Sequence, residues 1–182
     1  MASNTPAPVP CRECRHPVSK AAKACPRCGA PRPSLEKLPG TGFEWKSERT
    51  VYGWPLVHIA LGLDANGKFR VAKGVIAIGQ FGIGLFTFAQ VGVGFLFGFG
   101  QAMVGLTAIA QVAVTALFGI GQFASGYAAV GQLVLAYYGI GQAGLATHLW
   151  SLGVKDPEAA SFFTALAAKI GLHIGHWFHA PG

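Results

Sequence analysis

Between Gly74 and Val154 the chain carries no Asp, Glu, Lys or Arg, and glutamines stand at regular intervals among apolar residues. Successive glutamines are ten or eleven residues apart. Two such intervals make a repeat of about 21 residues, and a period of this length predicts stacked coils. The seven glutamines are Gln80, Gln90, Gln101, Gln111, Gln122, Gln132 and Gln142.

Large and small apolar residues alternate within each interval, as in FTFA at residues 86–89. An alternation with a period of two predicts β-strands with the large side chains on one face. We therefore predict a mainly β fold, in which residues 79–148 form a β-solenoid, or β-helix, of about four 21-residue coils. Each glutamine would lie at a corner, and the stacked amides are expected to form a structural hydrogen-bonded ladder.

The alternative fold is an α-helical membrane protein with several spans, because the uncharged stretch would hold about three helices of ~20 residues. Two features disfavour it. Each glycine in a helix interior costs about 1 kcal/mol relative to alanine, and this region is rich in glycine. Steps of ten and eleven residues would also spread the glutamines around a helix instead of along one face.

The alternation leaves open which face of the strands forms the core. If the small face is internal, the large apolar face points outward and must meet lipid, other copies of the chain, or the flanking elements. If the large face is internal, the repeat is a dry soluble core. The sequence does not decide between these two arrangements.

The repeat is expected to have a capping element at each end. Residues 49–78 predict a β-hairpin, because DANG at residues 64–67 has the Asn-Gly pair of a tight turn and joins two β-rich runs. Residues 149–182 predict a capping helix and tail that begin at Asp156-Pro157-Glu158, with Asp as the cap and Pro in the first turn. The apolar residues of this amphipathic helix are Phe162, Phe163, Leu166, Ile170 and Leu172.

Four cysteines lie near the start of the chain as two Cys-x2-Cys pairs separated by ten residues: Cys11, Cys14, Cys25 and Cys28. Two such knuckles can close a tetrahedral thiolate site around Zn²⁺, and four thiolates leave no open position for catalysis. We therefore expect a structural zinc over residues 11–30. Cysteines used in this way are typical of a reducing compartment, so we expect a cytoplasmic N-terminus.

The segment CRECRHPVSKAAKACPRCGAP resembles the short zinc ribbons at the N-termini of many bacterial proteins, often ahead of membrane-embedded segments. The resemblance implies a structural zinc held by the four cysteines. In the first knuckle, Arg15 stands where glycine is common. The apolar repeat is similar to the Gly-rich repeats of uncharacterised bacterial proteins, a resemblance that implies no activity.

The N-terminal part of the chain is basic, with 12 of the 14 Lys and Arg residues in residues 1–73. A patch on the ribbon could bind anionic lipid or nucleic acid, but no aromatic residue is interleaved with it as a stacking platform. Its members are Arg12, Arg15, Lys20, Lys23, Arg27 and Arg32. Composition predicts disorder in residues 1–10 and a linker in residues 31–48.

Few other residues suggest chemistry. His173, His176 and His179 are three apart, and the sequence leaves open whether they bind a metal, pack at an interface or do neither. His58 lies in an apolar strand, where we expect a hydrogen-bonded core or edge histidine. The chain offers no nucleophile–base pair and no carboxylate dyad, so we expect that it is not an enzyme.

These patterns favour a non-enzymatic, membrane-associated scaffold or interaction protein with a cytoplasmic N-terminus. Its apolar repeat would bind lipid or a second copy of the chain, and its ribbon would bind an unidentified protein partner. One alternative is a soluble or filament-forming β-solenoid in the cytoplasm. The other is a helical membrane protein with a regulatory ribbon.

Overall fold

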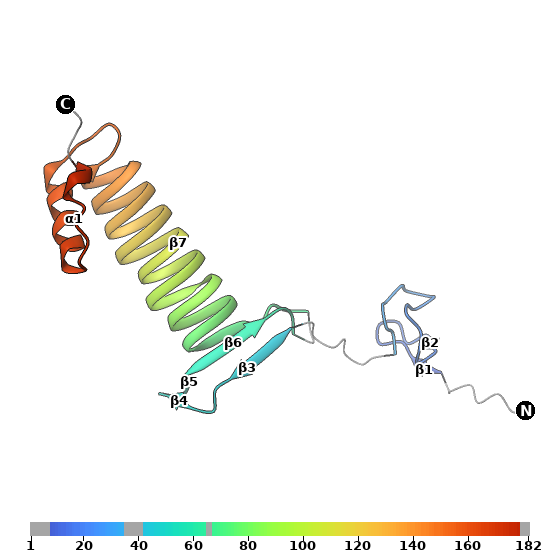
Figure 1. Cartoon of the computed structure of the whole chain (residues 1–182). Coiled ribbons are helices and arrows are strands. Elements are labelled where there is room, and N and C mark those ends of the chain that lie inside the picture. The colour runs from blue at the N-terminus through green and yellow to red at the C-terminus, as the bar shows by residue number, and fades with distance from the viewer. Residues whose placement is uncertain (1–7, 35–41, 65–66, 179–182) are drawn as a thin grey trace, which may run out of the picture. The chain divides into compact units, whose positions relative to one another are not determined.

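The computed structural model of the chain describes residues 8–34, 42–64 and 67–178 (Figure 1). The protein is mainly β, with one very long strand and a C-terminal α-helix. It divides into two compact units. One comprises residues 1–42 and 62–68, and the other comprises residues 43–61 and 69–182.

The first unit holds two short antiparallel strands, β1 (Val9–Pro10) and β2 (Pro17–Val18). The predicted disorder of residues 1–10 is therefore wrong for Val9 and Pro10, while residues 1–7 lie outside the described part of the chain. Its core is very small and includes two of the four cysteines. The buried residues of its core cluster are Cys11, Val18, Cys25 and Ala30, and Pro33 is also buried.

The second unit begins with a hairpin that the sequence analysis did not predict. Strand β3 (Phe43–Lys46) pairs antiparallel with β6 (Val57–Leu61), and β4 (Thr50–Val51) pairs with β5 (Trp54–Pro55) at the tip. Tyr52 and Gly53 make the turn, with φ values of 49° and 80°. Two positive φ values are typical of the two-residue turn that matches strand twist. The predicted linker, residues 31–48, is therefore wrong where β3 lies.

The hairpin predicted in residues 49–78 is wrong in its pairing. Strand β6 runs parallel to β7 (Val71–Trp150), with Val57 opposite Ile76. The segment between them does turn, because the Gly67 amide donates to the Asp64 carbonyl at 3.1 Å. Ala65 and Asn66 of the predicted turn lie outside the described residues. The chain turns where the sequence predicted it. The residues of β7 that pair with β6 begin only at Ile76, nine residues after Gly67, and the pair is parallel.

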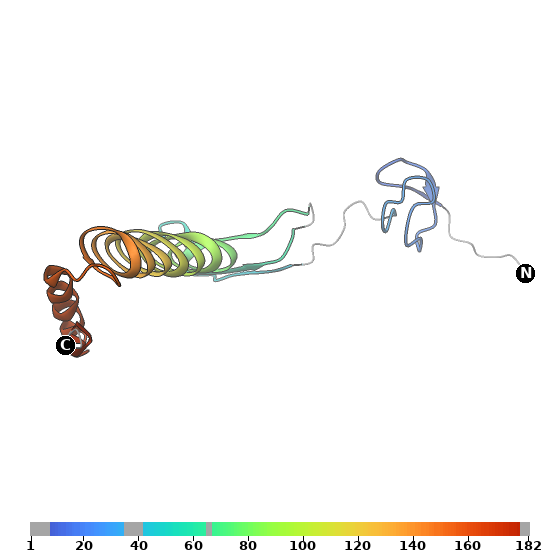
Figure 2. The ribbon, with the colours of Figure 1, turned by 90° about the horizontal axis from the view of Figure 1, so that it is seen from above.

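Strand β7 is 80 residues long and winds around an axis (Figures 1 and 2). The glycines show which residues lie on neighbouring windings. A Cβ atom added to Gly84 would lie 2.4 Å from the carbonyl oxygen of Gly74, and one added to Gly105 would lie 1.9 Å from that of Gly94. Residues ten or eleven apart are therefore adjacent. The predicted coil of 21 residues is wrong, because the sequence repeat spans two windings whose lengths alternate.

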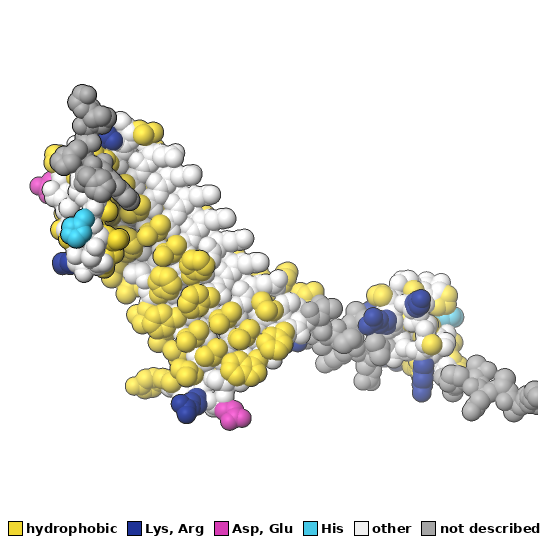
Figure 3. All heavy atoms as spheres, viewed as in Figure 1, with side chains coloured by type: hydrophobic (Ala, Val, Ile, Leu, Met, Phe, Trp, Pro, Cys, Tyr) yellow, Lys and Arg dark blue, Asp and Glu magenta, His cyan; other side chains and the backbone are white. Residues whose placement is uncertain are grey.

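Small side chains fill the inside of β7, and large ones point outward. This settles the alternative that the sequence left open. Alanines such as Ala77, Ala113 and Ala124 are fully buried, and Met103 and Val134 are the largest fully buried apolar side chains of the windings. Phe95 and Phe99 are half-exposed, and hydrophobic side chains cover much of the β7 surface seen in Figure 3. The interior is narrow, since most of the side chains buried in it are alanines.

The C-terminal helix was predicted correctly at its start. Helix α1 (Pro157–Lys169) has Asp156 as its N-cap, and this side chain accepts a hydrogen bond from the Glu158 amide at 2.9 Å. Its buried face holds Ala159, Phe163 and Ala167. The predicted apolar pattern extends too far, because the exposed Ile170 and Leu172 lie beyond the helix.

Aromatic side chains join α1 to the last windings of β7. The Phe162 ring stacks on Tyr138 with 4.1 Å between centroids, and His148 Nδ1 lies 2.9 Å from Asp156 Oδ2. A 3₁₀ helix, η1 (Gly175–Phe178), follows. The α-helical alternative is wrong, since the uncharged stretch is strand. Among the described residues, no helix has the length and apolar character needed to cross a membrane.

Candidate metal centre

The two Cys-x2-Cys segments of the ribbon fold into equivalent loops. In each loop the first cysteine carbonyl accepts an amide hydrogen four residues later, from Arg15 to Cys11 and from Gly29 to Cys25, both at 2.9 Å. The amide of Cys11 donates to the His16 carbonyl at 2.8 Å, and the amide of Cys25 donates to the Ala30 carbonyl at 2.9 Å. Each loop therefore presents two sulfur atoms on the same side.

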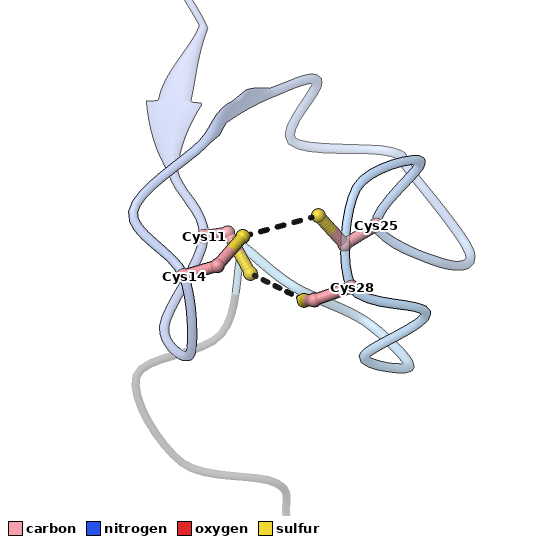
Figure 4. A group of neighbouring side chains, drawn as sticks. All are labelled: Cys11, Cys14, Cys25 and Cys28. Carbon is pink, nitrogen blue, oxygen red and sulfur yellow. Dashed lines mark hydrogen bonds between the residues drawn. The ribbon is translucent and has the colours of Figure 1, made fainter.

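The four sulfur atoms converge, as Figure 4 shows. Cys11 Sγ lies 3.8 Å from Cys28 Sγ, Cys14 Sγ lies 3.6 Å from Cys25 Sγ, and all four lie within 4.8 Å of one another. Zinc–sulfur bonds of about 2.3 Å in a tetrahedron require sulfur atoms roughly 3.8 Å apart. The four-cysteine group could therefore hold a metal ion, and its spacing is consistent with a zinc ribbon.

The thiols differ in acidity. Burial of Cys25 opposes ionisation, but the backbone amides of Cys28 and Arg27 outweigh it and lower its pKa to about 7. The Ala30 amide favours ionisation of Cys28, yet its three sulfur neighbours and burial raise its pKa to about 12. Donors from the loop therefore support a thiolate at Cys25, and the thiolate is the form that binds metals.

The two loops differ in the residue after the second cysteine. Gly29 has φ of 73°, and Arg15 adopts φ of 58° at the matching position of the first loop. This left-handed conformation costs a residue with a Cβ atom roughly 1–2 kcal/mol. The departure from glycine noticed in the sequence is therefore tolerated with some backbone strain, and the ligand geometry is kept.

The basic residues of the ribbon are mostly exposed. Arg12 is half-buried, and its Nε atom lies 3.5 Å from Glu13 Oε1. The other five predicted members of the basic patch are exposed: Arg15, Lys20, Lys23, Arg27 and Arg32. Their ligand stays a prediction.

The glutamines of the predicted ladder lie on β7. Six of the glutamines, from Gln90 on, are exposed, and Gln80 is half-buried. Their spacing of ten or eleven residues equals the spacing between adjacent windings, so successive glutamines lie on successive windings. A regular row of white atoms, the colour of uncharged polar side chains and of the backbone, follows one edge of β7 in Figure 3. Hydrogen bonding between the amides stays a prediction.

The C-terminal histidines do not form a described site. His173 is exposed, the side chain of His176 is not described, and His179 lies outside the described residues. Within the described part of the chain, only the four cysteines form a group that could hold a metal.

The sequence analysis missed a charged cluster at the first winding. His58 is buried, as predicted. Its Nε2 atom lies 3.2 Å from Glu44 Oε1, and its Nδ1 atom accepts the Lys73 amide hydrogen at 2.7 Å. Glu44 also accepts from Lys46 Nζ at 2.9 Å and from Arg70. The hydrogen bond from Lys46, together with Arg70 and His58, lowers the pKa of Glu44 despite some burial. Glu44, His58 and Lys73 are far apart in sequence, and the β3–β6 and β6–β7 pairings together bring them close.

Comparisons of the chain with protein-family models, with curated proteins and with solved structures found no match.

Proposed function

We propose that this chain is a non-enzymatic, membrane-associated scaffold. Its four cysteines would bind a structural Zn²⁺. Its long strand would be a β-solenoid in which each coil is one winding of ten or eleven residues. The observation that carries the proposal is the outward apolar face of β7. Leu117, Leu133 and Leu135 are each about half-exposed, at 50, 50 and 52%. A water-facing monomer rarely exposes so many large apolar side chains together.

Assignment of β7 to the solenoid class is supported by two features. Residues ten or eleven apart lie on adjacent windings, and the glycines at these contacts have carbonyl oxygens where a Cβ atom would be. The stacked backbone resembles a repeat architecture in which each unit contacts only its neighbours. Such an array hydrogen-bonds most of its backbone internally, which suits contact between its outer side chains and lipid.

The choice of Zn²⁺ is supported by the donor set. Four thiolates in two tight loops favour zinc over hard cations, which prefer oxygen ligands. In this proposal the zinc would fix the two loops, and the exposed basic side chains of the ribbon would contact an acidic protein partner or the anionic membrane surface. The N-terminus would then lie on the cytoplasmic side.

The experiment is flotation of the purified zinc-loaded chain with vesicles of zwitterionic phospholipid. The proposal predicts that the chain floats with the vesicles and loses solubility when detergent is removed without lipid. Replacing Leu117 and Leu135 with Asp should reduce flotation, because the charges would have to enter an apolar environment. Replacing both with Ile is the matched control and should leave flotation unchanged.

A soluble, filament-forming protein is the second candidate, because the same face could pair with a copy of itself. Sedimentation velocity in plain buffer separates the two candidates. A monodisperse chain that ignores vesicles would contradict membrane association, and ordered polymers that ignore vesicles would favour the filament.

A further inference from the structure

One face of β7 carries a wholly apolar groove of about 410 Å³. Two columns of side chains line it, because residues ten or eleven apart lie on successive windings. Val71, Phe81 and Val91 belong to one column, and Ile83, Val93 and Val104 belong to the other. The groove therefore runs across the windings and is as long as several of them.

A second cavity, of about 540 Å³, lies at the N-terminal end of this groove. Val71 lines both cavities, so they share a wall. The second cavity also contains Lys46, Trp54, His58 and Lys73. Lys73 comes ten residues before Ile83 and so heads the second column of the groove. The apolar groove thus ends at a cavity lined by charged residues and by Trp54.

The charge of this end is positive. Lys46 and Arg70 already pair with the single carboxylate of Glu44, and Lys73 is exposed. Three cations against one carboxylate give a net charge of +2 if His58 is neutral. An anion would therefore be attracted to Lys73, whose ammonium has no ion pair among the residues the structure describes.

The backbone at Lys73 is held in place by a buried group. His58 is 3% exposed, and its Nδ1 atom accepts the Lys73 amide hydrogen at 2.7 Å. Its Nε2 atom then donates to Glu44 Oε1 at 3.2 Å. These two bonds link β3, β6 and β7 and fix Lys73 where the charged cavity meets the groove.

We infer that the groove and its charged end form one binding site for a single-chain anionic amphiphile, a long-chain carboxylate. The carboxylate would bind at Lys73, beside Lys46, and the alkyl chain would lie along the groove. From the winding of Lys73 to the last one that lines the groove there are four steps of about 4.8 Å, or roughly 19 Å. The wholly apolar lining suits an alkyl chain, and the single cationic end sets its direction. This site does not depend on membrane association.

The test is calorimetric titration of the full zinc-loaded chain with dodecanoate below its micelle-forming concentration. We expect saturable binding of one molecule per chain. Dodecyltrimethylammonium, which has the same chain and the opposite charge, should bind at least roughly tenfold more weakly, because it meets the cations. Octanoate should also bind more weakly, since each buried CH₂ contributes about 0.8 kcal/mol.

Two variants separate the charged end from the groove. Lys73→Gln should weaken dodecanoate binding roughly tenfold, whereas Lys169→Gln, on the distant helix, should leave it unchanged. Val93→Trp should block the groove and abolish binding, whereas Leu117→Trp, outside it, should not. Circular dichroism of each variant verifies folding, and because Lys73→Gln changes only an exposed side chain, it tests the site even if Val93→Trp unfolds.

The inference is overturned if the cationic amphiphile binds as tightly as dodecanoate, or if the folded Lys73→Gln variant binds as well as the wild type. Vesicle flotation distinguishes this failure from failure of the proposed function. Flotation without dodecanoate binding would retain the scaffold proposal and overturn the site, whereas dodecanoate binding without flotation would do the reverse.

Discussion

The ribbon is stabilised by a different kind of contact from the one that stabilises the long strand β7. The core cluster of the ribbon consists of four buried residues, two of which are cysteines, and its four sulfur atoms converge on one point. Strand β7 has no such point, because each winding repeats the same close contact with the winding before it. One region depends on a few irreplaceable side chains, and the other on a contact made many times.

This difference determines how each region should fail. Loss of one ligand should unfold the ribbon completely, because the proposed Zn²⁺ would contribute most of its folding free energy. Loss of one contact in β7 should leave the other windings in place, because each contacts only its neighbours. The following changes test this contrast, from the largest expected effect to the smallest.

Replacing Cys25 with Ser should unfold the ribbon, because structural zinc contributes about 10–16 kcal/mol in small metal-held modules. Backbone amide exchange measured across the whole chain should show lost protection in residues 9–33 and no change in β7. Lys20→Gln, an exposed change in the same module, is the control. Retained protection of the ribbon in Cys25→Ser would contradict a metal-held module.

Replacing Gly100 with Ala should destabilise the windings by about 3 kcal/mol, because forcing an extra carbon into a close-packed contact has costs of this order. The new Cβ atom would lie 1.7 Å from the carbonyl oxygen of Ala89, so the backbone must move. Gly153→Ala is the matched control, since nothing lies within 4 Å of a Cβ atom there. Equal thermal unfolding of the two variants would contradict the close stacking of the windings.

Replacing Asp156 with Ala should destabilise α1 by about 1 kcal/mol at pH 7, because a helix cap is lost. The Glu158 amide, and then His148, lowers the pKa of Asp156 in the folded chain. The stabilisation is therefore complete above the unfolded pKa of about 3.9 and is lost as the pH falls through the lower folded value.

Chemical denaturation of wild type and Asp156→Ala, followed by circular dichroism between pH 7 and pH 2, measures this dependence. The difference between the two proteins should shrink only at the acid end of the range. Asp156→Asn, which can still cap, is the control and should lose less. A difference independent of pH would contradict the role of the ionised carboxylate.

Replacing Arg15 with Gly should stabilise the ribbon by about 1 kcal/mol, because glycine adopts a left-handed conformation without the Cβ penalty. Arg27, in the second loop, has no such conformation, so Arg27→Gly should destabilise by about 0.5–1 kcal/mol through the unfolded chain. Competition for zinc with a chelator at several concentrations measures both effects. The account would be wrong if both substitutions changed ribbon stability in the same direction.

The two regions also differ in what their sequences predict. The cysteine spacing predicted the convergence of the four sulfur atoms, because a Cys-x2-Cys loop has few possible shapes. The alternation of large and small residues predicted the strand character of the repeat. It could not give the length of a winding, because two windings of unequal length produce one longer sequence period.

Pairing between distant segments was predicted least well. Tyr52-Gly53 is the turn of the hairpin at the start of the second unit, and glycine was its one signal. Asn66-Gly67 was the stronger signal, yet the strands that flank it pair in parallel. The cluster of Glu44, His58 and Lys73 could not be predicted, because it depends on the registers of both strand pairs. Local sequence patterns predict turns and the two faces of a strand, whereas the pairing of strands depends on the fold of the whole chain.

The central claim is that β7 advances by one winding for every ten or eleven residues. Its most direct test is the distance between spin labels at positions 80 and 142, introduced through a genetically encoded ketone side chain that leaves the cysteines unmodified. Gln80 and Gln142 are six glutamine intervals apart. Pulsed electron resonance should then give about 29 Å, six steps of ~4.8 Å. A distance near 14 Å, as expected for three coils of 21 residues, would contradict the account.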